Sequence, residues 1–259
     1  MSFLKKMMAS VGIGSARVNT VLEDAQVRAG EPLRGTVYVK GGSVEQQIDT
    51  IYIHLMTQYR REVENGTARE SISLGHFPVV ESFTLAPGEN REFPFEVLLP
   101  DETPVSVGHT QVWLKTGLDI AMAVDPGDTD YLEVLPHRSA EVVFVALDRL
   151  GFRLRQAECE YSRRLGRSYP FVQQFEFVPV AGQFRGHLDE LELILFPHAG
   201  GLDLWMEVDR RARGFAGLLE EALDADEARL HVEFEQEHIA QGPEAVAGYL
   251  AEIIAQHAR

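Results

Sequence analysis

Three arginines close together are the densest basic feature of this chain. Arg210, Arg211 and Arg213 stand in the stretch VDRRARGF, where a strand-like segment gives way to a helix-like one. A guanidinium group can hold a carboxylate through two parallel hydrogen bonds, so these side chains could bind an acidic group of a partner protein. They could also pair with the acidic run EEALDADEA that follows them. We favour pairing within the fold and keep the three as candidate partner-binding residues.

Two groups of side chains could supply metal ligands. VDPGDTDYL offers three carboxylates, but their spacing departs from a calcium-binding loop and no bidentate Glu follows at its place. The stretch HLDE offers an imidazole beside carboxylates, a set that suits a divalent metal but more often forms a solvated strand edge. We predict neither a metal nor a cofactor. The candidates are Asp125, Asp128 and Asp130 in the first group and His187, Asp189 and Glu190 in the second.

No motif for catalysis stands out. The chain lacks a G-x-S-x-G stretch, a P-loop and a dinucleotide-binding fingerprint. Cys159 is the only cysteine, and no histidine lies near it in sequence to stabilise a thiolate. We therefore expect a small buried thiol here and a protein that is not an enzyme.

The composition limits the class of partner. The chain has 259 residues and a formal net charge of -16, which disfavours binding to nucleic acid or to an anionic membrane surface. A single cysteine allows no intrachain disulfide and fits a reducing cytoplasm. No apolar stretch reaches the 18 residues of a membrane-spanning helix. The opening MSFLKKMMASVGIG is expected to form a short helix.

The elements that must position any site are mainly strands. In REFPFEVLL, one face carries Phe93, Phe95, Val97 and Leu99, and the other carries Glu92, Pro94, Glu96 and Leu98. Similar alternation recurs in TIYIHLMTQY and HTQVWLKTGLDIAM. A period of two residues indicates half-buried strands. Turn signals such as APGEN and DPGD separate these runs. We predict an antiparallel β-sandwich over residues 1–136.

A helical segment should connect this lobe to a second one. In PHRSAEVVFVALDRLG, helical spacing relates Val142, Val145, Ala146 and Arg149, which predicts a connector helix over 137–150. The valine-rich interior makes a strand the alternative. Alternation then resumes in YPFVQQFEFVPV and in the hairpin DELELILFPHAGGLDLWMEV. We predict a second β-sandwich lobe over 151–259.

The chain ends in an amphipathic helix. In GPEAVAGYLAEIIAQ, Val246, Leu250 and Ile253 form one apolar stripe. The stripe must pack either on its own lobe or on a second copy of the chain. These three residues are the second set of candidate partner-binding residues, and they suggest self-association.

The stretch FPFEVLLPDETPVS, followed by GHTQVWLKTGLDIA and DYLEV, resembles arrestin-like proteins. A closer resemblance is to the bacterial sporulation-control family of that superfamily, carried by SFLKKMMASVGIGSARVNTVL, LDRLGFRLRQAECEY, YPFVQQFEF and VDRRARG. The resemblance implies two arrestin-like β-sandwich lobes. It also implies a non-catalytic regulatory or adaptor protein of the cytoplasm that acts through protein contacts.

The alternative is a small-ligand or carbohydrate-binding β-sandwich. Such a module would use Trp113 or Trp205 as a stacking platform beside polar side chains. The two hypotheses differ in whether Trp205 is open to solvent in a groove. A hydrolase is a third possibility that rests only on the abundance of carboxylates.

Overall fold

The computed structural model describes residues 15–120, 125–209 and 229–257 and confirms a mainly β protein. The expected N-terminal helix and Arg210, Arg211 and Arg213 lie outside the described residues. The described strands are β1 (Arg17–Leu22), β2 (Gln26–Arg28), β3 (Pro32–Lys40), β4 (Gln46–Val63), β5 (Gly66–Val80), β6 (Phe83–Leu85), β7 (Asn90–Leu98), β8 (Val112–Ile120), β9 (Gly127–Leu135), β10 (Phe152–Tyr161), β11 (Phe171–Pro179), β12 (Glu190–His198), β13 (Gly201–Asp209) and β14 (Arg229–Glu235). The described helices are α2 (Arg138–Arg149), α4 (Gln236–Ala240) and α5 (Pro243–His257).

The chain divides into two compact units. The first comprises 1–57, 71–100 and 111–134, and the second comprises 58–70, 101–110 and 135–259. The second unit therefore includes two segments from the first half of the sequence: the tip of the β4–β5 hairpin and the loop that follows Pro100.

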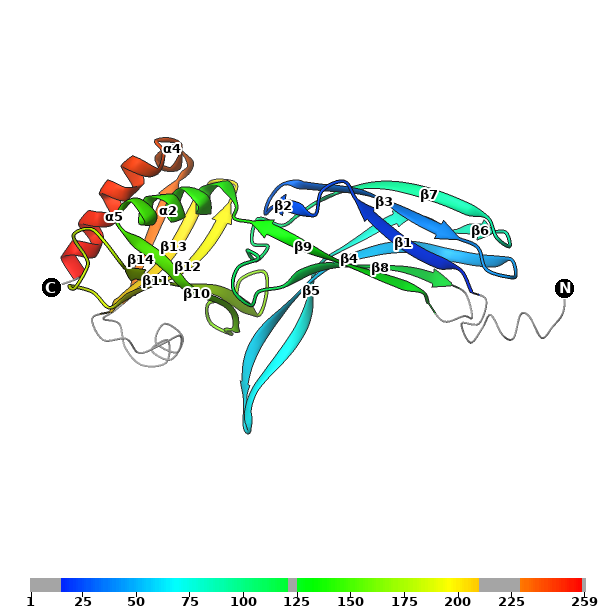
Figure 1. Cartoon of the computed structure of the whole chain (residues 1–259), viewed down its shortest axis with the longest axis horizontal. Helices are drawn as coiled ribbons and strands as arrows, with labels where there is room; N and C mark the ends of the chain where they lie inside the picture. The colour runs from blue at the N-terminus through cyan, green and yellow to red at the C-terminus, as the bar shows by residue number, and fades with distance from the viewer. Residues whose placement is uncertain (1–14, 121–124, 210–228, 258–259) are drawn as a thin grey trace. The chain divides into compact units, whose positions relative to one another are not determined.

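The first unit has two layers of strands (Figure 1). One sheet has the order β1-β3-β7, and in the other β4 pairs with β8 and β8 with β9, all antiparallel. Val37 on β3 and Ile53 on β4 are completely buried and alternate with more exposed neighbours, as strand geometry requires. Inside the unit, the Thr20 hydroxyl donates to the Thr116 hydroxyl at 2.7 Å and joins β1 to β8.

The second unit has one antiparallel sheet, in the order β14-β13-β12-β11-β10, with α2 and α5 on one face (Figure 1). The predicted second sandwich is therefore wrong for the described residues. The alternating leucines of the β12–β13 hairpin meet the apolar stripes of two helices, not a second sheet. Leu193, Leu204, Leu147 and Leu250 are each completely buried in this shared core.

Helix α2 begins and ends where the sequence indicates, but it faces the core with a different stripe. The His137 side chain accepts a hydrogen bond from the Ser139 N–H at the N-terminus, and Gly151, with a φ of 88°, follows the C-terminus. Val143 and Ala146 are completely buried, whereas Val145 is 39% exposed. Val145 lies one turn from Glu141 and Asp148, on the exposed polar face of the helix, whereas Val143, Ala146 and Leu147 lie on the opposite, buried face.

Candidate functional site

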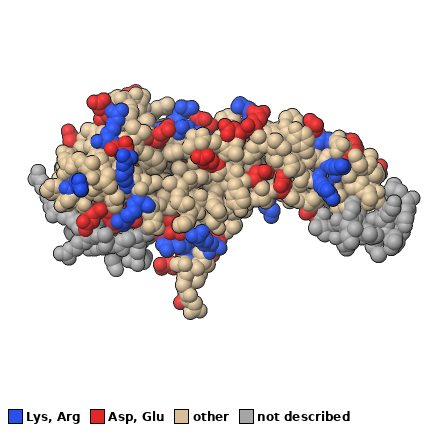
Figure 2. All heavy atoms as spheres, in the orientation of Figure 1, with Lys and Arg blue, Asp and Glu red and all other residues tan. Residues whose placement is uncertain are grey.

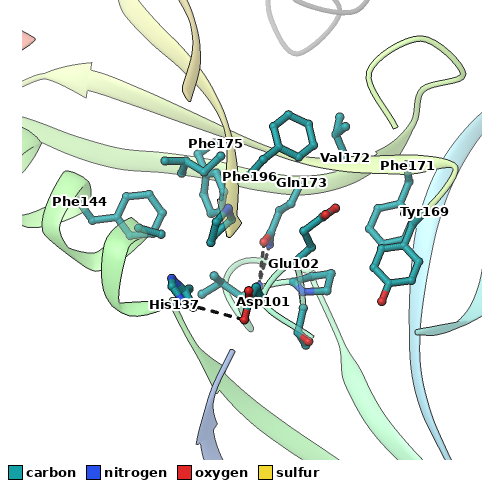
Figure 3. A pocket seen from close by; sticks show the side chains of 16 residues that line it. Asp101, Glu102, His137, Phe144, Tyr169, Phe171, Val172, Gln173, Phe175 and Phe196 are labelled. Atoms are coloured by element: carbon teal, nitrogen blue, oxygen red, sulfur yellow. Dashed lines mark hydrogen bonds and ion pairs between the residues drawn. The ribbon is translucent and has the colours of Figure 1, made fainter. Parts of the chain in front are cut away.

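The second unit contains a pocket beside the loop that follows β7. We call it the aromatic pocket (Figure 3). Phe144, Phe175 and Phe196 lie on one side in this view, and Tyr169 and Phe171 on the other. The lining consists of residues 101–105 of the loop, His137, Ala140 and Phe144 at the start of α2, Tyr169, residues 171–173 and Phe175 of β11, and residues 195–197 of β12.

Gln173 fixes the loop against β11. Its Oε1 accepts the Val105 N–H at 2.8 Å, and its Nε2 donates to the Val105 carbonyl at 2.8 Å. The same Nε2 donates to the Thr110 hydroxyl at 3.2 Å. Both main-chain groups of Val105 are thus satisfied by one side chain, which gives the pocket a rigid wall.

The start of α2 forms a second wall. His137 Nδ1 accepts the Ser139 N–H at 3.3 Å and lies 2.8 Å from the Ser139 hydroxyl. With Nδ1 acting as acceptor, the proton of the neutral ring lies on Nε2. That nitrogen faces the Asp101 carboxylate at 4.0 Å. Capping the helix therefore also orients His137 toward the loop.

The loop places two adjacent carboxylates at the pocket. Asp101 and Glu102 are both partly exposed, and Glu102 Oε1 accepts a hydrogen bond from the Ser168 hydroxyl at 3.0 Å. Burial raises the pKa of Tyr169 to about 12, and the negative charge of Glu102 adds to this effect. The phenol therefore stays protonated, and the negative charge of the pocket comes from its carboxylates.

The pocket is small. Its cavity volume is about 40 Å³, space for roughly three water molecules at 10–15 Å³ each. This suits the tip of one side chain better than a cofactor or a metabolite. Aromatic rings around fixed polar groups are a common composition for recognition sites.

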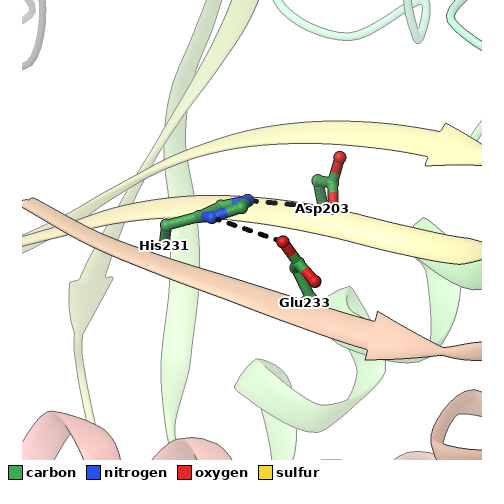
Figure 4. A group of neighbouring side chains, drawn as sticks. All are labelled: Asp203, His231 and Glu233. Carbon is green, nitrogen blue, oxygen red and sulfur yellow. Dashed lines mark ion pairs between the residues drawn. The ribbon is translucent and has the colours of Figure 1, made fainter.

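A second group of side chains lies on β13 and β14 (Figure 4). Asp203 and Glu233 are direct cross-strand neighbours, and the His231 ring lies between them. His231 Nε2 is 3.7 Å from Asp203 Oδ1, and its Nδ1 is 3.8 Å from Glu233 Oε1. Among the described residues, this is the set of three His, Cys, Asp or Glu side chains close enough to share a metal.

Neighbouring side chains already contact Asp203 and His231. Arg167 Nη1 lies 2.6 Å from Asp203 Oδ2, and Trp205 stacks on the His231 ring at 4.6 Å. Each ring nitrogen of His231 faces a different carboxylate, so one ion cannot use both nitrogens. The His231 ring lies between two carboxylates at distances longer than hydrogen bonds.

The candidate metal ligands from the sequence do not converge among the described residues. Asp125 accepts the Ile120 N–H at 3.0 Å, and Asp128 accepts the Thr20 N–H at 2.7 Å, so both carboxylates support the turn and its neighbours. Glu190 is 1% exposed and is bound by Arg155, whereas His187 and Asp189 are exposed.

The stripe of α5 lies in the core of its own unit. Val246 is 2% exposed and Leu250 is completely buried, while Ile253 is partly buried against the same core. Val246 and Leu250 therefore offer no surface to a second copy. The prediction that this stripe binds a partner is corrected, because α2 and the sheet already cover it.

Cys159 is buried, and burial raises the pKa of its thiol to about 12. At neutral pH it is a protonated, enclosed thiol, and this position is unsuited to a nucleophile.

Trp205 is half-buried on the sheet face opposite the helices, against Ile194 and Phe196. His231 already covers part of its ring. This arrangement does not favour Trp205 as a platform for a sugar.

Basic side chains gather where residues 58–70, the end of the β4–β5 hairpin, project from the body of the protein, with acidic side chains beside them (Figure 2). Arg60 binds Glu160 and lies 3.6 Å from Glu158, while Arg61 lies 3.5 Å from Glu70. Because each of these arginines has an acidic neighbour, this part of the surface is a network of ion pairs.

Sequence reasoning missed the aromatic pocket. In the sequence, the loop segment DETPV contributes only to the family resemblance of FPFEVLLPDETPVS, and YPFVQQFEFVPV predicts only a strand. The two segments are about 70 positions apart and meet only in the folded unit. The one available signal was an acidic pair, Asp101 and Glu102, set between two prolines that stiffen the loop.

Within the described residues, every helix is too short or too polar to span a membrane. A family model described as SpoOM protein matches residues 4–212. The sporulation-control protein spo0M of Bacillus subtilis (strain 168) is 43% identical over 258 residues, which cover 100% of both chains. The crystal structure of Spo0M from Bacillus subtilis superposes with a TM-score of 0.87 at 42% identity, covering 95% of this chain and 100% of that one.

Proposed function

Because the chain belongs to the SpoOM protein family, we propose that it is a regulatory protein that acts by binding other proteins and not by catalysis. The relative in Bacillus subtilis is named a sporulation-control protein. We extend regulatory control to this chain, and an arrestin-like adaptor role with it. The cytoplasm is the proposed compartment, since a single cysteine forms no intrachain disulfide.

The aromatic pocket is the main structural support for this proposal. It combines aromatic rings with two carboxylates on a loop that Gln173 fixes in place. Interfaces concentrate their binding energy in a few side chains that enter such pockets, and a preformed wall lowers the entropy lost on binding. We propose that a partner protein docks here through one inserted side chain.

Self-association is a separate proposal. The stripe of α5 does not support it, so it rests on sheet edges such as that of β5, which pairs with β4. Light scattering of the full chain across a hundredfold range of concentration tests it. A constant monomer mass would remove self-association and leave the binding of other proteins untouched.

The proposed function is tested by capture followed by reconstitution. The immobilised full chain is exposed to native cell extract, bound proteins are displaced with free chain, and each captured protein is purified. We expect at least one purified protein to bind the chain with defined stoichiometry in calorimetry. The proposal is overturned if no captured protein binds after purification.

A further inference from the structure

We propose that the aromatic pocket recognises a basic side chain, arginine or lysine, presented by the partner protein. This inference rests on the proposed function and specifies the chemistry of its ligand. It is carried by the carboxylates, the rings and the size of the pocket.

The sign of the charge comes from the loop. Asp101 and Glu102 are adjacent in sequence and both line the cavity. Glu102 accepts a hydrogen bond from the neutral Ser168 hydroxyl, which leaves the negative charge of the carboxylate in place. An incoming cation would form a charge-assisted bond here, whereas a carboxylate or phosphate ligand would be repelled.

The rings suit the same ligand. A guanidinium or ammonium group is attracted to the face of an aromatic ring. The protein already uses this contact on a ring of the pocket, since the Arg167 guanidinium lies 4.0 Å from the centroid of Phe196. Phe144 and Tyr169 are the partly exposed rings of the lining, whereas Phe171, Phe175 and Phe196 are buried.

Size and desolvation exclude other ligands. A cavity of about 40 Å³ admits a side-chain tip. A purely apolar tip would strip water from two carboxylates without replacing their hydrogen bonds, which is unfavourable. Lysine and arginine avoid this problem, because an apolar stem carries the charged group past the rings to the loop.

The test uses side-chain analogues as probes. The ¹⁵N-labelled full chain is titrated at low salt with n-butylguanidinium chloride, n-butylammonium chloride and n-butanol, and amide shifts are followed by NMR. We expect both cations to shift signals of residues 101–105 and 171–173, with dissociation constants on the order of 1 mM for such small ligands. Butanol should bind at least about tenfold more weakly.

Glu102→Gln provides the decisive comparison, because it removes the charge and keeps the shape. It should weaken binding of n-butylguanidinium about tenfold, the loss expected for one charge-assisted contact. Glu81→Gln is the matched control, since it removes one exposed carboxylate in the first unit and should leave binding unchanged.

Two results would overturn the inference. One is equal binding of butanol and the cations, unaffected by Glu102→Gln, which would define an apolar pocket. The other is the absence of shifts at the pocket. The inference and the proposed function can fail separately. If captured partners bound the wild type and Glu102→Gln equally, the inference alone would be refuted. If the cations bound but no partner could be reconstituted, only the proposed function would be refuted.

Discussion

Removing the Gln173 side chain should release the loop that forms one wall of the aromatic pocket. The Gln173→Ala substitution deletes two hydrogen bonds of 2.8 Å to the main chain of Val105 and one of 3.2 Å to Thr110. A hydrogen bond between neutral groups contributes about 1 kcal/mol net, and the longer third bond should contribute less. Because the site is partly buried, water can replace part of this loss.

The expected loss of stability is roughly 2–3 kcal/mol. For a unit of this size, such a loss lowers the melting temperature by roughly 4–12 °C. The Val105 amide, whose donor bond is removed, should also exchange with solvent faster than in the wild type. Circular dichroism melts and amide hydrogen exchange measure the two effects.

Gln183→Ala is the matched control, because Gln183 is an exposed glutamine of the same unit. It should change neither the melting temperature nor the exchange of Val105. If Gln173→Ala melted within 1 °C of the wild type and left the Val105 amide protected, Gln173 would not be holding the loop. The description of a preformed pocket would then be wrong.

Three further predictions follow from buried groups. Leu250→Ala should lower the free energy of unfolding by about 3 kcal/mol at any protein concentration. Tyr249→Ala, at a half-exposed neighbour, should lower it far less. Equal losses for the two variants in denaturant melts would show that α5 does not lie in the core. Burial raises the pKa of Asp130, and the negative charge of Asp128 adds to this effect. The folded protein therefore binds a proton at Asp130 more tightly than the unfolded chain does. The contribution of Asp130 to the free energy of unfolding falls as the pH rises through the raised pKa. Asp130→Asn should therefore stabilise the protein at pH 7 by roughly 0.5 kcal/mol, discounted for partial exposure, with the gain vanishing toward pH 3.8; a gain independent of pH would contradict this cause. Cys159, with its thiol pKa near 12, should resist a disulfide reagent at pH 8 until urea is added, and rapid native labelling would contradict its burial.

The period of two predicted strands in the first unit because successive side chains there alternate between more buried and more exposed positions, as in β3 and β7. At the end of β7, Val97 and the residue after the strand, Leu99, are buried while Leu98 between them is 63% exposed. However, alternation of side chains along a strand does not show whether its buried face packs against a second sheet or against helices. The same leucine pattern in β12 and β13 suits a sandwich or a sheet under helices, and the second unit has the latter among its described residues.

The candidate site was harder to predict for a related reason. The α5 stripe was visible as a pattern, but whether it met its own unit or a second copy depended on contacts distant in sequence. The pocket is made by such contacts alone: Glu102 meets Ser168 and Val105 meets Gln173 across more than 60 positions. The pattern of residues within one segment does not reveal contacts between segments that are distant in sequence.

A partner protein that docks at the aromatic pocket through a basic side chain should depend on the charge of Glu102 for its affinity. The most direct measurement is calorimetry of the purified partner with the wild type and with Glu102→Gln. We predict about tenfold weaker binding of the variant, and binding of the wild type that weakens as salt increases. If the partner bound both proteins with the same affinity at every salt concentration, it would not bind through a basic side chain at Glu102.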